Sequence, residues 1–271
     1  MNRPVLSKLL ALAVGIACVF FAFKYNKSAL YETSGSIYGT YWKLVSTEYI
    51  PDPLIQSIKQ ELNRIDFVAS NYKPSSELSI INAAPINTEI VISSDMYTIL
   101  KFAEDLHQLS NGYYDVTIGS LIIKEGFGPE SSMVDNALPV SKKRFNFLNN
   151  NSITKNDNFQ FDLSSIAKGY ALDSISNLLM KANRNNYLID IGGEIIVNGS
   201  KHGEPWTVGI QSPSAMNNQS DTQIRSNKFL AIATSGEYRN FKLNDNGVVT
   251  SHTFIPEIQK SLIDKSYSVT V

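Results

Sequence analysis

Cysteine is almost absent from this sequence. The 271 residues contain only Cys18, which excludes an intramolecular disulfide, a zinc site built from several cysteines, and chemistry that needs two thiols. Histidine is also scarce, with three residues. A functional site in these residues must therefore rely mainly on hydroxyls, carboxylates, lysines and aromatic rings.

An excess of charge of either sign is also lacking. The 24 basic and 25 acidic residues leave a net charge of -1, and the basic residues form no long run. No recognisable nucleic-acid motif is present, so we expect no nucleic-acid partner. The glycine patterns G-x-G-x-x-G and G-x-x-x-x-G-K-[ST] are missing as well, which argues against a dinucleotide-binding Rossmann turn and a P-loop.

The N-terminus has one apolar run, and it is short. Leu9 to Phe23 covers 15 residues between basic flanks, a pattern typical of an export signal or a short membrane anchor. We assign residues 1–24 to this segment and residues 25–35 to a polar spacer. Cys18 follows Gly15-Ile16-Ala17 and partly resembles a lipoprotein processing site; the alternative is a small hydrophobic residue inside the signal.

Hydrophobic periodicity after the spacer predicts an α+β fold in a single domain over residues 36–271. Helices are expected from apolar spacing over 54–69 and 94–109, and the second should stop at Asn111-Gly112. Residues 141–158 indicate a surface excursion that ends in a strand carrying Phe159 and Phe161. Further strands are expected at 37–49, 187–191, 194–197, 206–211, 229–233 and 238–243.

The segment from Asp162 to Asp173 concentrates chemistry. Ser164 or Ser165 can cap a helix there, which would set free N–H groups beside Lys168 and suit a phosphate-bearing ligand. Asp162 could accept hydrogen bonds from a ligand or help to hold a cation. The alternative is an ordinary capped surface helix with a solvated lysine.

Several turns offer weaker signals. Tyr113, Tyr114 and Asp115 follow Gly112, so a planar ring could stack there, although such an aromatic pair is often only packing. Tyr72 lies in a turn-rich loop that could close over a ligand. We interpret Gly192-Gly193 as a bulge between strands rather than a ligand contact.

Taken together, these motifs resemble the signature of the ApbE family, the flavin transferases that use FAD and magnesium to attach FMN to proteins. The resemblance covers roughly residues 36–256. The matching segments occur in the family's order: Tyr38-Gly39-Thr40; Tyr72 with Ser76-Glu77-Leu78-Ser79 and Asn82; Gly112 to Thr117; Gly126-Phe127-Gly128-Pro129; Asp162 to Asp173; Asp190 to Glu194; Trp206 to Gln211; and Thr234 to Arg239 followed by Ser251-His252.

The resemblance implies a single ApbE-like domain of mixed, mostly antiparallel sheets with packed helices. It implies that a Thr or Ser hydroxyl of an acceptor protein attacks the FMN-side phosphorus of FAD, that AMP leaves, and that His252 assists proton removal. By motif position, the implied magnesium ligand is the backbone carbonyl of Ser165. The FAD contacts it implies are Tyr38, Tyr72, Tyr113, Tyr114, Asp115, Asp162, Lys168 and Phe254.

The sequence departs from the family pattern in three places. Tyr38 stands where Met is usual, and Phe254-Ile255-Pro256-Glu257-Ile258-Gln259 lacks the acid and glycine expected after the histidine. The sequence stops at Val271, whereas the family continues into an Ala-Asp-x-x-x-Thr segment whose Asp and Thr bind magnesium. We therefore expect a C-terminally truncated domain that binds FAD but transfers little.

Three functions remain open on the sequence. The leading one is a flavin transferase at the periplasmic face of the inner membrane, anchored or lipidated at its N-terminus, with an acceptor protein of an electron-transport complex as partner. The second is a relative that binds FAD without turning it over. The third is a membrane-anchored structural or interaction protein.

Overall fold

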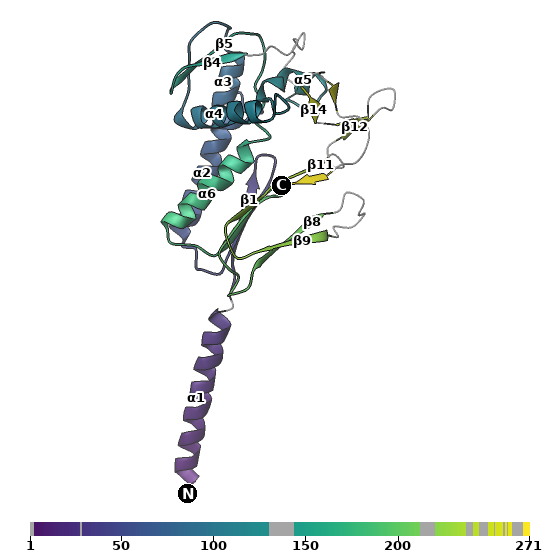
Figure 1. Cartoon of the computed structure of the whole chain (residues 1–271). Helices are drawn as coiled ribbons and strands as arrows, with labels where there is room; N and C mark the ends of the chain where they lie inside the picture. The colour runs from purple at the N-terminus through teal and green to yellow at the C-terminus, as the bar shows by residue number, and fades with distance from the viewer. Residues whose placement is uncertain are drawn as a thin grey trace.

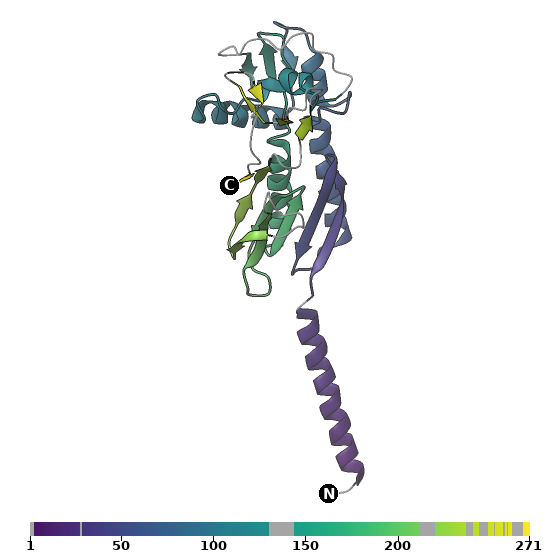
Figure 2. The ribbon, with the colours of Figure 1, turned by 90° about the vertical axis from the view of Figure 1, so that its right-hand side faces the viewer.

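The computed structural model describes residues 3–27, 29–129, 144–211, 220–236, 241–243, 249–251, 253–256, 258, 260–261 and 268–271. The first helix, α1 (Arg3–Lys27), projects away from the rest of the chain (Figures 1 and 2), and those of its side chains that are described are exposed. Among the described residues, no helix combines the length and the hydrophobicity needed to cross a membrane.

A five-stranded antiparallel sheet forms the centre of the fold. Alternate side chains of its strands point to opposite faces, and each face has its own hydrophobic core. Leu44 and Ile189 belong to one core, whereas Val45 and Val197 belong to the other. In spatial order the strands are β1 (Tyr31–Ile37), β2 (Thr40–Ser46), β6 (Tyr187–Ile191), β7 (Glu194–Asn198) and β10 (Leu230–Ile232).

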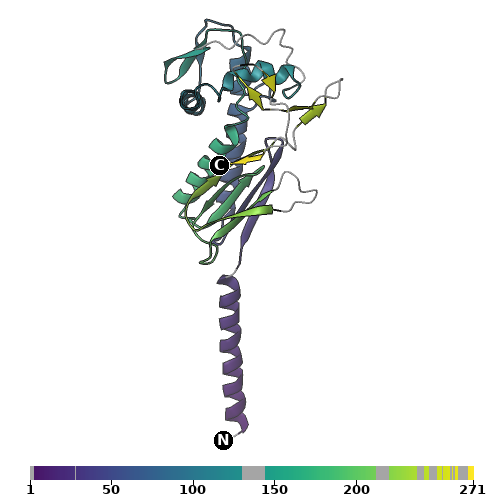
Figure 3. The same cartoon turned by 45° about the vertical axis from the view of Figure 1, so that its right-hand side comes forward.

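Different elements cover the two faces (Figures 1 and 3). Helices α2 (Asp52–Ala69) and α6 (Ala167–Lys181) pack on one face, where Ile58, Leu62 and Ile175 are buried. The hairpin of β8 (Trp206–Gln211) and β9 (Ser220–Ser226) covers the other face. The sheet is thus the middle layer of the molecule.

A further hydrophobic core lies beyond the end of the sheet. It is built by α3 (Glu77–Ala83), α4 (Ser94–Leu109) and the three-stranded sheet β3-β5-β4, together with the buried Phe159 and Phe161. Tyr170 on α6 packs against both this core and the core under α2, so the two are continuous. The remaining elements of this part are β3 (Ile90–Val91), β4 (Phe145–Asn149), β5 (Ser152–Lys155), the short 3₁₀ turn η1 (Val116–Ile118) and α5 (Gly119–Lys124).

The C-terminal strands form three small antiparallel pairs. They are β11 (Thr234–Gly236) with β16 (Ser268–Thr270), β12 (Phe241–Leu243) with β13 (Val249–Ser251), and β14 (Phe254–Ile255) with β15 (Lys260–Ser261). Val271 exchanges two backbone hydrogen bonds with Ala233. The end of the chain therefore pairs with the segment that follows β10.

The α+β fold with antiparallel sheets is confirmed. The helix predicted over 54–69 is α2, which begins at Asp52. The helix predicted over 94–109 is α4, capped by Ser93, whose hydroxyl accepts from Met96 N at 3.1 Å. It ends as expected, since Asn111 and Gly112 have φ values of 54° and 87°.

Other expectations were wrong in detail. Residues 31–35 belong to β1 rather than to a spacer, and residues 145–155 form the hairpin β4–β5 rather than a surface excursion, with Phe145 and Ile153 buried. Phe159 and Phe161 lie in no strand. Their segment is held instead by Asn82, whose Oδ1 accepts from Phe161 N at 2.7 Å and whose Nδ2 donates to Phe161 O at 3.0 Å.

Candidate functional site

The loop before α6 is organised by the Asp162 side chain. This buried carboxylate accepts hydrogen bonds through Oδ1 from the Ser164 backbone N–H at 2.8 Å and from the Ser164 hydroxyl, and through Oδ2 from Asn71 Nδ2 at 2.7 Å. A carboxylate offers about four acceptor positions. Three protein donors leave it limited capacity for a ligand.

The serines of this loop do not cap the helix, contrary to the prediction. Helix α6 has Ile166 as its N-cap, with no side-chain cap. The hydroxyl of Ser164 donates to Asp162, and the Ser165 hydroxyl lies 3.0 Å from the Tyr114 hydroxyl. Because both hydroxyls bind other residues, neither serine accepts a hydrogen bond from the N–H groups of the first turn of α6.

Tyr114 and Asp115 join the site from the loop after α4. His107 Nδ1 lies 2.8 Å from the Tyr114 carbonyl oxygen, and burial raises the pKa of the Tyr114 hydroxyl. Asp115 Oδ1 accepts from the N–H and hydroxyl of Thr117 at 2.8 and 2.7 Å and so caps η1. This local role accounts for one oxygen of Asp115.

The aromatic residues Tyr72 and Tyr113 directly adjoin Asn71 and Tyr114, which contact this loop. Tyr72 and Tyr113 are 69% and 68% exposed, so both rings are free to stack on a planar ligand. The Tyr72 hydroxyl donates to the Phe127 carbonyl at 3.3 Å, and the Phe127 ring contacts Phe254 edge-on, with centroids 6.4 Å apart. Phe254 itself is buried, and it can offer a ligand little surface.

Two hairpin turns lie at the same end of the central sheet. Tyr38 and Gly39 join β1 to β2 with φ values of 53° and 71°, and Gly192 and Gly193 join β6 to β7 with values of 58° and 95°. Positive φ at both turn residues is typical of tight hairpin turns. The Gly192-Gly193 pair is therefore a hairpin turn, and the predicted bulge was wrong.

Tyr38, in the first of these turns, and Glu194, directly after the second, already have protein partners. The Tyr38 hydroxyl donates to the Leu62 carbonyl at 2.9 Å, and burial, reinforced by the Asp66 and Glu61 charges, raises the pKa of Tyr38 well above its usual value. Lys168 Nζ forms an ion pair with Glu194 Oε1 at 3.0 Å. Lys168 is thus neither a purely solvated lysine nor one held free for phosphate.

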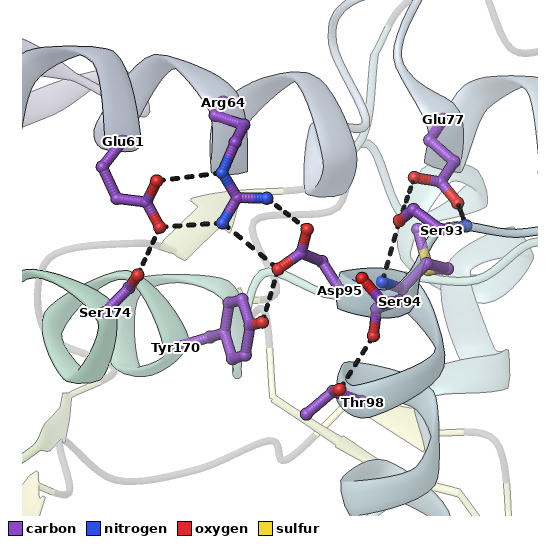
Figure 4. A network of polar contacts seen from close by, with 10 residues as sticks. Glu61, Arg64, Glu77, Ser93, Ser94, Asp95, Thr98, Tyr170 and Ser174 are labelled. Atoms are coloured by element: carbon purple, nitrogen blue, oxygen red, sulfur yellow. Dashed lines mark hydrogen bonds and ion pairs between the residues drawn. The ribbon is translucent and has the colours of Figure 1, made fainter. Parts of the chain in front are cut away.

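A polar network fixes α6 against α2 and α4 (Figure 4). The Arg64 guanidinium donates to Glu61 at 2.7 and 2.9 Å and also bonds Asp95, and the Tyr170 hydroxyl donates to Asp95 Oδ1 at 2.6 Å. Ser174 donates to Glu61. Hydrogen bonds to the two acids raise the pKa of Arg64, and the bond from Arg64 lowers that of Glu61. The network sets the position of the first turns of α6, which carry Lys168.

The remaining predicted residues divide between described and undescribed parts. His252 and the Glu237-Tyr238-Arg239 motif lie outside the described residues. Over the parts of the chain that are described, no three acidic, histidine or cysteine side chains gather into a group that could hold a metal ion. The metal role of the Ser165 carbonyl stays a prediction.

Sequence reasoning missed Asn71 and Glu194 as partners of the site. Glu194 ends a motif that was recognised, but it was interpreted only as the start of a strand, and Asn71, directly before the Tyr72 motif, was interpreted only as part of a turn. The polar side chains of Asn71 and Glu194 were the only feature of the sequence that could have indicated a role in the site. Their partners Asp162 and Lys168 could not be assigned, because Asn71 and Asp162 are 91 positions apart.

Comparisons with known proteins relate the chain to one protein family. The ApbE family profile matches residues 38–271. An FAD:protein FMN transferase of Vibrio cholerae is 32% identical over 255 residues, which are 88% of this chain and 75% of that protein. One of Haemophilus influenzae is 28% identical over 292 residues, covering 99% and 82%.

Solved structures show the same fold. The flavin transferase ApbE from Vibrio cholerae superposes with a TM-score of 0.75 at 28% identity and covers 89% of this chain and 81% of its own. The ApbE protein from Thermotoga maritima gives a TM-score of 0.78 at 25% identity with the same coverage.

Proposed function

The chain belongs to the ApbE family, and from this premise we propose that it transfers FMN from FAD to a threonine or serine hydroxyl of an acceptor protein. The observation that carries the proposal is the match over residues 38–271, since it includes every segment that forms the candidate site. Relatives that are at least 28% identical over most of this chain bear the name of this enzyme.

The described residues fit FAD as a substrate. The exposed rings of Tyr72 and Tyr113 offer stacking surfaces for the isoalloxazine or the adenine. A side chain at Gly39 or Gly193 would meet no atom within 4 Å, so a ligand can approach the backbone of both turns closely. In this proposal Lys168 and the first turn of α6, which has no side-chain cap, attract the pyrophosphate.

The proposed reaction is a single displacement at phosphorus. The acceptor hydroxyl oxygen forms a bond to the FMN-side phosphorus, the bond from that phosphorus to the bridging oxygen breaks, and AMP leaves with that oxygen. His252 takes the proton of the hydroxyl in this proposal, which rests on its motif position. Lys168 stabilises the phosphate charge, and the tyrosine rings orient the substrate.

Magnesium enters the proposal on family resemblance alone. The described residues bring no three acidic, histidine or cysteine side chains together, so waters and substrate phosphates would have to complete the near-octahedral oxygen coordination that this ion requires. The Ser165 carbonyl and the Asp162 carboxylate are the oxygens proposed at this loop. No step is derived through the metal.

We further propose export and membrane association through the N-terminus, with action at the periplasmic face of the inner membrane on an acceptor of an electron-transport complex. Support comes from the basic flanks of the apolar run in residues 1–24. Substituting Cys18→Ser tests lipidation. Loss of membrane association in this variant would favour a lipoprotein, whereas unchanged membrane association would favour an unmodified signal or anchor.

A transfer assay separates the three functions. The protein is incubated with FAD, magnesium and an acceptor carrying a Thr or Ser flavinylation site. Chromatography measures the release of AMP, and the fluorescence of the denatured acceptor measures the attached flavin. AMP release with a fluorescent acceptor supports the transferase. FAD binding without AMP identifies a binding module. If FAD neither binds nor stabilises the protein, the proposal fails. An acceptor with Ala at the modified position is the control.

A further inference from the structure

The loop between α2 and α3 presents Asn71 in a defined orientation. The Tyr72 N–H donates to Ser70 Oγ at 3.2 Å, and the Ser76 hydroxyl donates to the Ser70 carbonyl at 2.6 Å. Lys73 adds an ion pair with Asp66. Because the loop is held on both sides, the Asn71 side chain reaches Asp162 from a fixed backbone.

The direction of the Asn71 amide follows from its partner. Nδ2 donates to Asp162 Oδ2 at 2.7 Å, and a reversed amide would set its carbonyl oxygen against the carboxylate. Oδ1 therefore faces away from Asp162. This oxygen is buried and accepts no hydrogen bond from the described part of the chain, an unfavourable state that a native protein normally relieves with a partner.

The missing partner must be a hydrogen-bond donor. Asn71 Oδ1 is an acceptor, and its neighbour Asp162 is a carboxylate, so phosphate oxygens would be repelled at this point. The adjoining residues Tyr72 to Ser75 are exposed, which leaves the loop accessible from solvent. An N–H on the edge of a planar ring stacked on Tyr72 is a hydrogen-bond donor and can enter from the exposed side of the loop.

We propose that Asn71 Oδ1 accepts a hydrogen bond from an N–H on the edge of a ring of bound FAD, while Asn71 Nδ2 holds the Asp162 carboxylate in place. This inference rests on the proposed function, because FAD is its ligand. FAD carries two such donors, the amino group of adenine and N3–H of the isoalloxazine. Asn71 is then a specificity residue that selects a ring edge with a donor over one with only acceptors.

The test compares Asn71→Leu with the wild-type chain in binding FAD, ADP and FMN. Leu keeps the approximate size of Asn but neither donates nor accepts, so FAD affinity should fall about tenfold, as for a lost hydrogen bond that leaves a donor unpaired. If the affinity falls for ADP but not for FMN, the contact is with adenine. If the affinity falls for FMN but not for ADP, the contact is with the flavin ring. Asn63→Leu, an exposed site on α2, is the matched control.

Two results overturn the inference. One is unchanged FAD affinity in Asn71→Leu, and the other is an equal loss for ADP and FMN, because a general loss indicates only a disturbed loop. Thermal unfolding monitors the fold, and Asn71→Ser, a smaller change that removes the amide carbonyl, replaces Leu if that variant does not fold. Failure of the wild-type chain to bind FAD would instead count against the proposed function.

Discussion

Charged side chains of the candidate site already have partners within the chain. Asp162 accepts from Asn71 and Ser164, and Lys168 pairs with Glu194. Such pairing lowers the freedom of each side chain before a ligand arrives. A phosphate that bound Lys168 would have to share the lysine with Glu194 or displace Glu194, so we expect Glu194 to lower the affinity of the lysine for anions.

Replacing Lys168 with Ala should weaken FAD binding by ~1.5 to 3 kcal/mol, the range for a hydrogen bond to a charged group. The Lys168–Glu194 pair is partly exposed, with side chains 30% and 15% accessible, so the variant should lose less than about 1 kcal/mol of folding free energy. Flavin fluorescence titration measures the binding free energy, and urea unfolding measures the folding free energy.

Glu194→Gln is the control, because it frees the lysine and should not weaken FAD binding. Equal affinity in Lys168→Ala and wild type would contradict the assignment.

The sequence could point to Asp162 and Lys168, because a carboxylate and a lysine beside a helix start form a local pattern. It could not supply the partners of these residues, which come from the loop at Asn71 and the strand at Glu194. It also could not show that Ser164 turns to Asp162 instead of capping α6. Local chemistry is readable from spacing, whereas contacts between distant segments depend on the tertiary fold.

At the scale of elements, α2 and α4 were predictable because each has an apolar stripe and recognisable ends. Hairpin β4–β5 was not, since its Asn-rich turn dominates the composition and the buried residues of β5 include the polar Ser152 and Lys155 beside Ile153. Strand β1 was missed for a similar reason: it is an edge strand with mostly exposed polar side chains. Edge strands need little hydrophobicity, so periodicity identifies them poorly.

The link between α4 and α6 predicts a pH effect on stability. Burial, the hydrogen bond with Asp95 and its charge raise the pKa of the Tyr170 hydroxyl from 10.0 to about 12. The folded state therefore holds this proton more tightly than the unfolded state. The corresponding stability is complete below pH 10 and is lost as the pH rises from 10 to about 12.

Tyr170→Phe should accordingly flatten the decline of the unfolding free energy between pH 10 and about 12. Urea unfolding at several pH values in this interval measures the slope. Tyr113→Phe, at an exposed position, should leave the slope as in wild type. An identical slope in Tyr170→Phe and wild type would show that the tyrosine does not titrate in this window.

At the scale of the whole molecule, α1 stands outside the packed body. None of its residues belongs to the three hydrophobic cores of the described chain, and it points away from the other elements (Figure 1). The body therefore owes its stability to contacts that begin with β1.

Removing residues 1–28 should leave the melting temperature and FAD affinity unchanged and should abolish membrane association. Differential scanning calorimetry, fluorescence titration and cell fractionation measure the three properties. A drop of several degrees in the melting temperature would reveal packing of α1 against the body. Continued sedimentation with membranes would assign that association to another surface.

The pairing of β1 also determines how the body responds to mechanical load. Tyr31, the first residue of β1, pairs with Ser46 at the open end of an antiparallel hairpin. Tension applied through α1 would pull on that pair first and open the ladder one pair at a time toward the Tyr38-Gly39 turn, rather than shearing all pairs together. Since β1 is an edge strand with largely exposed side chains, a pulled molecule would lose this strand at low force while the central sheet from β2 onward stays folded.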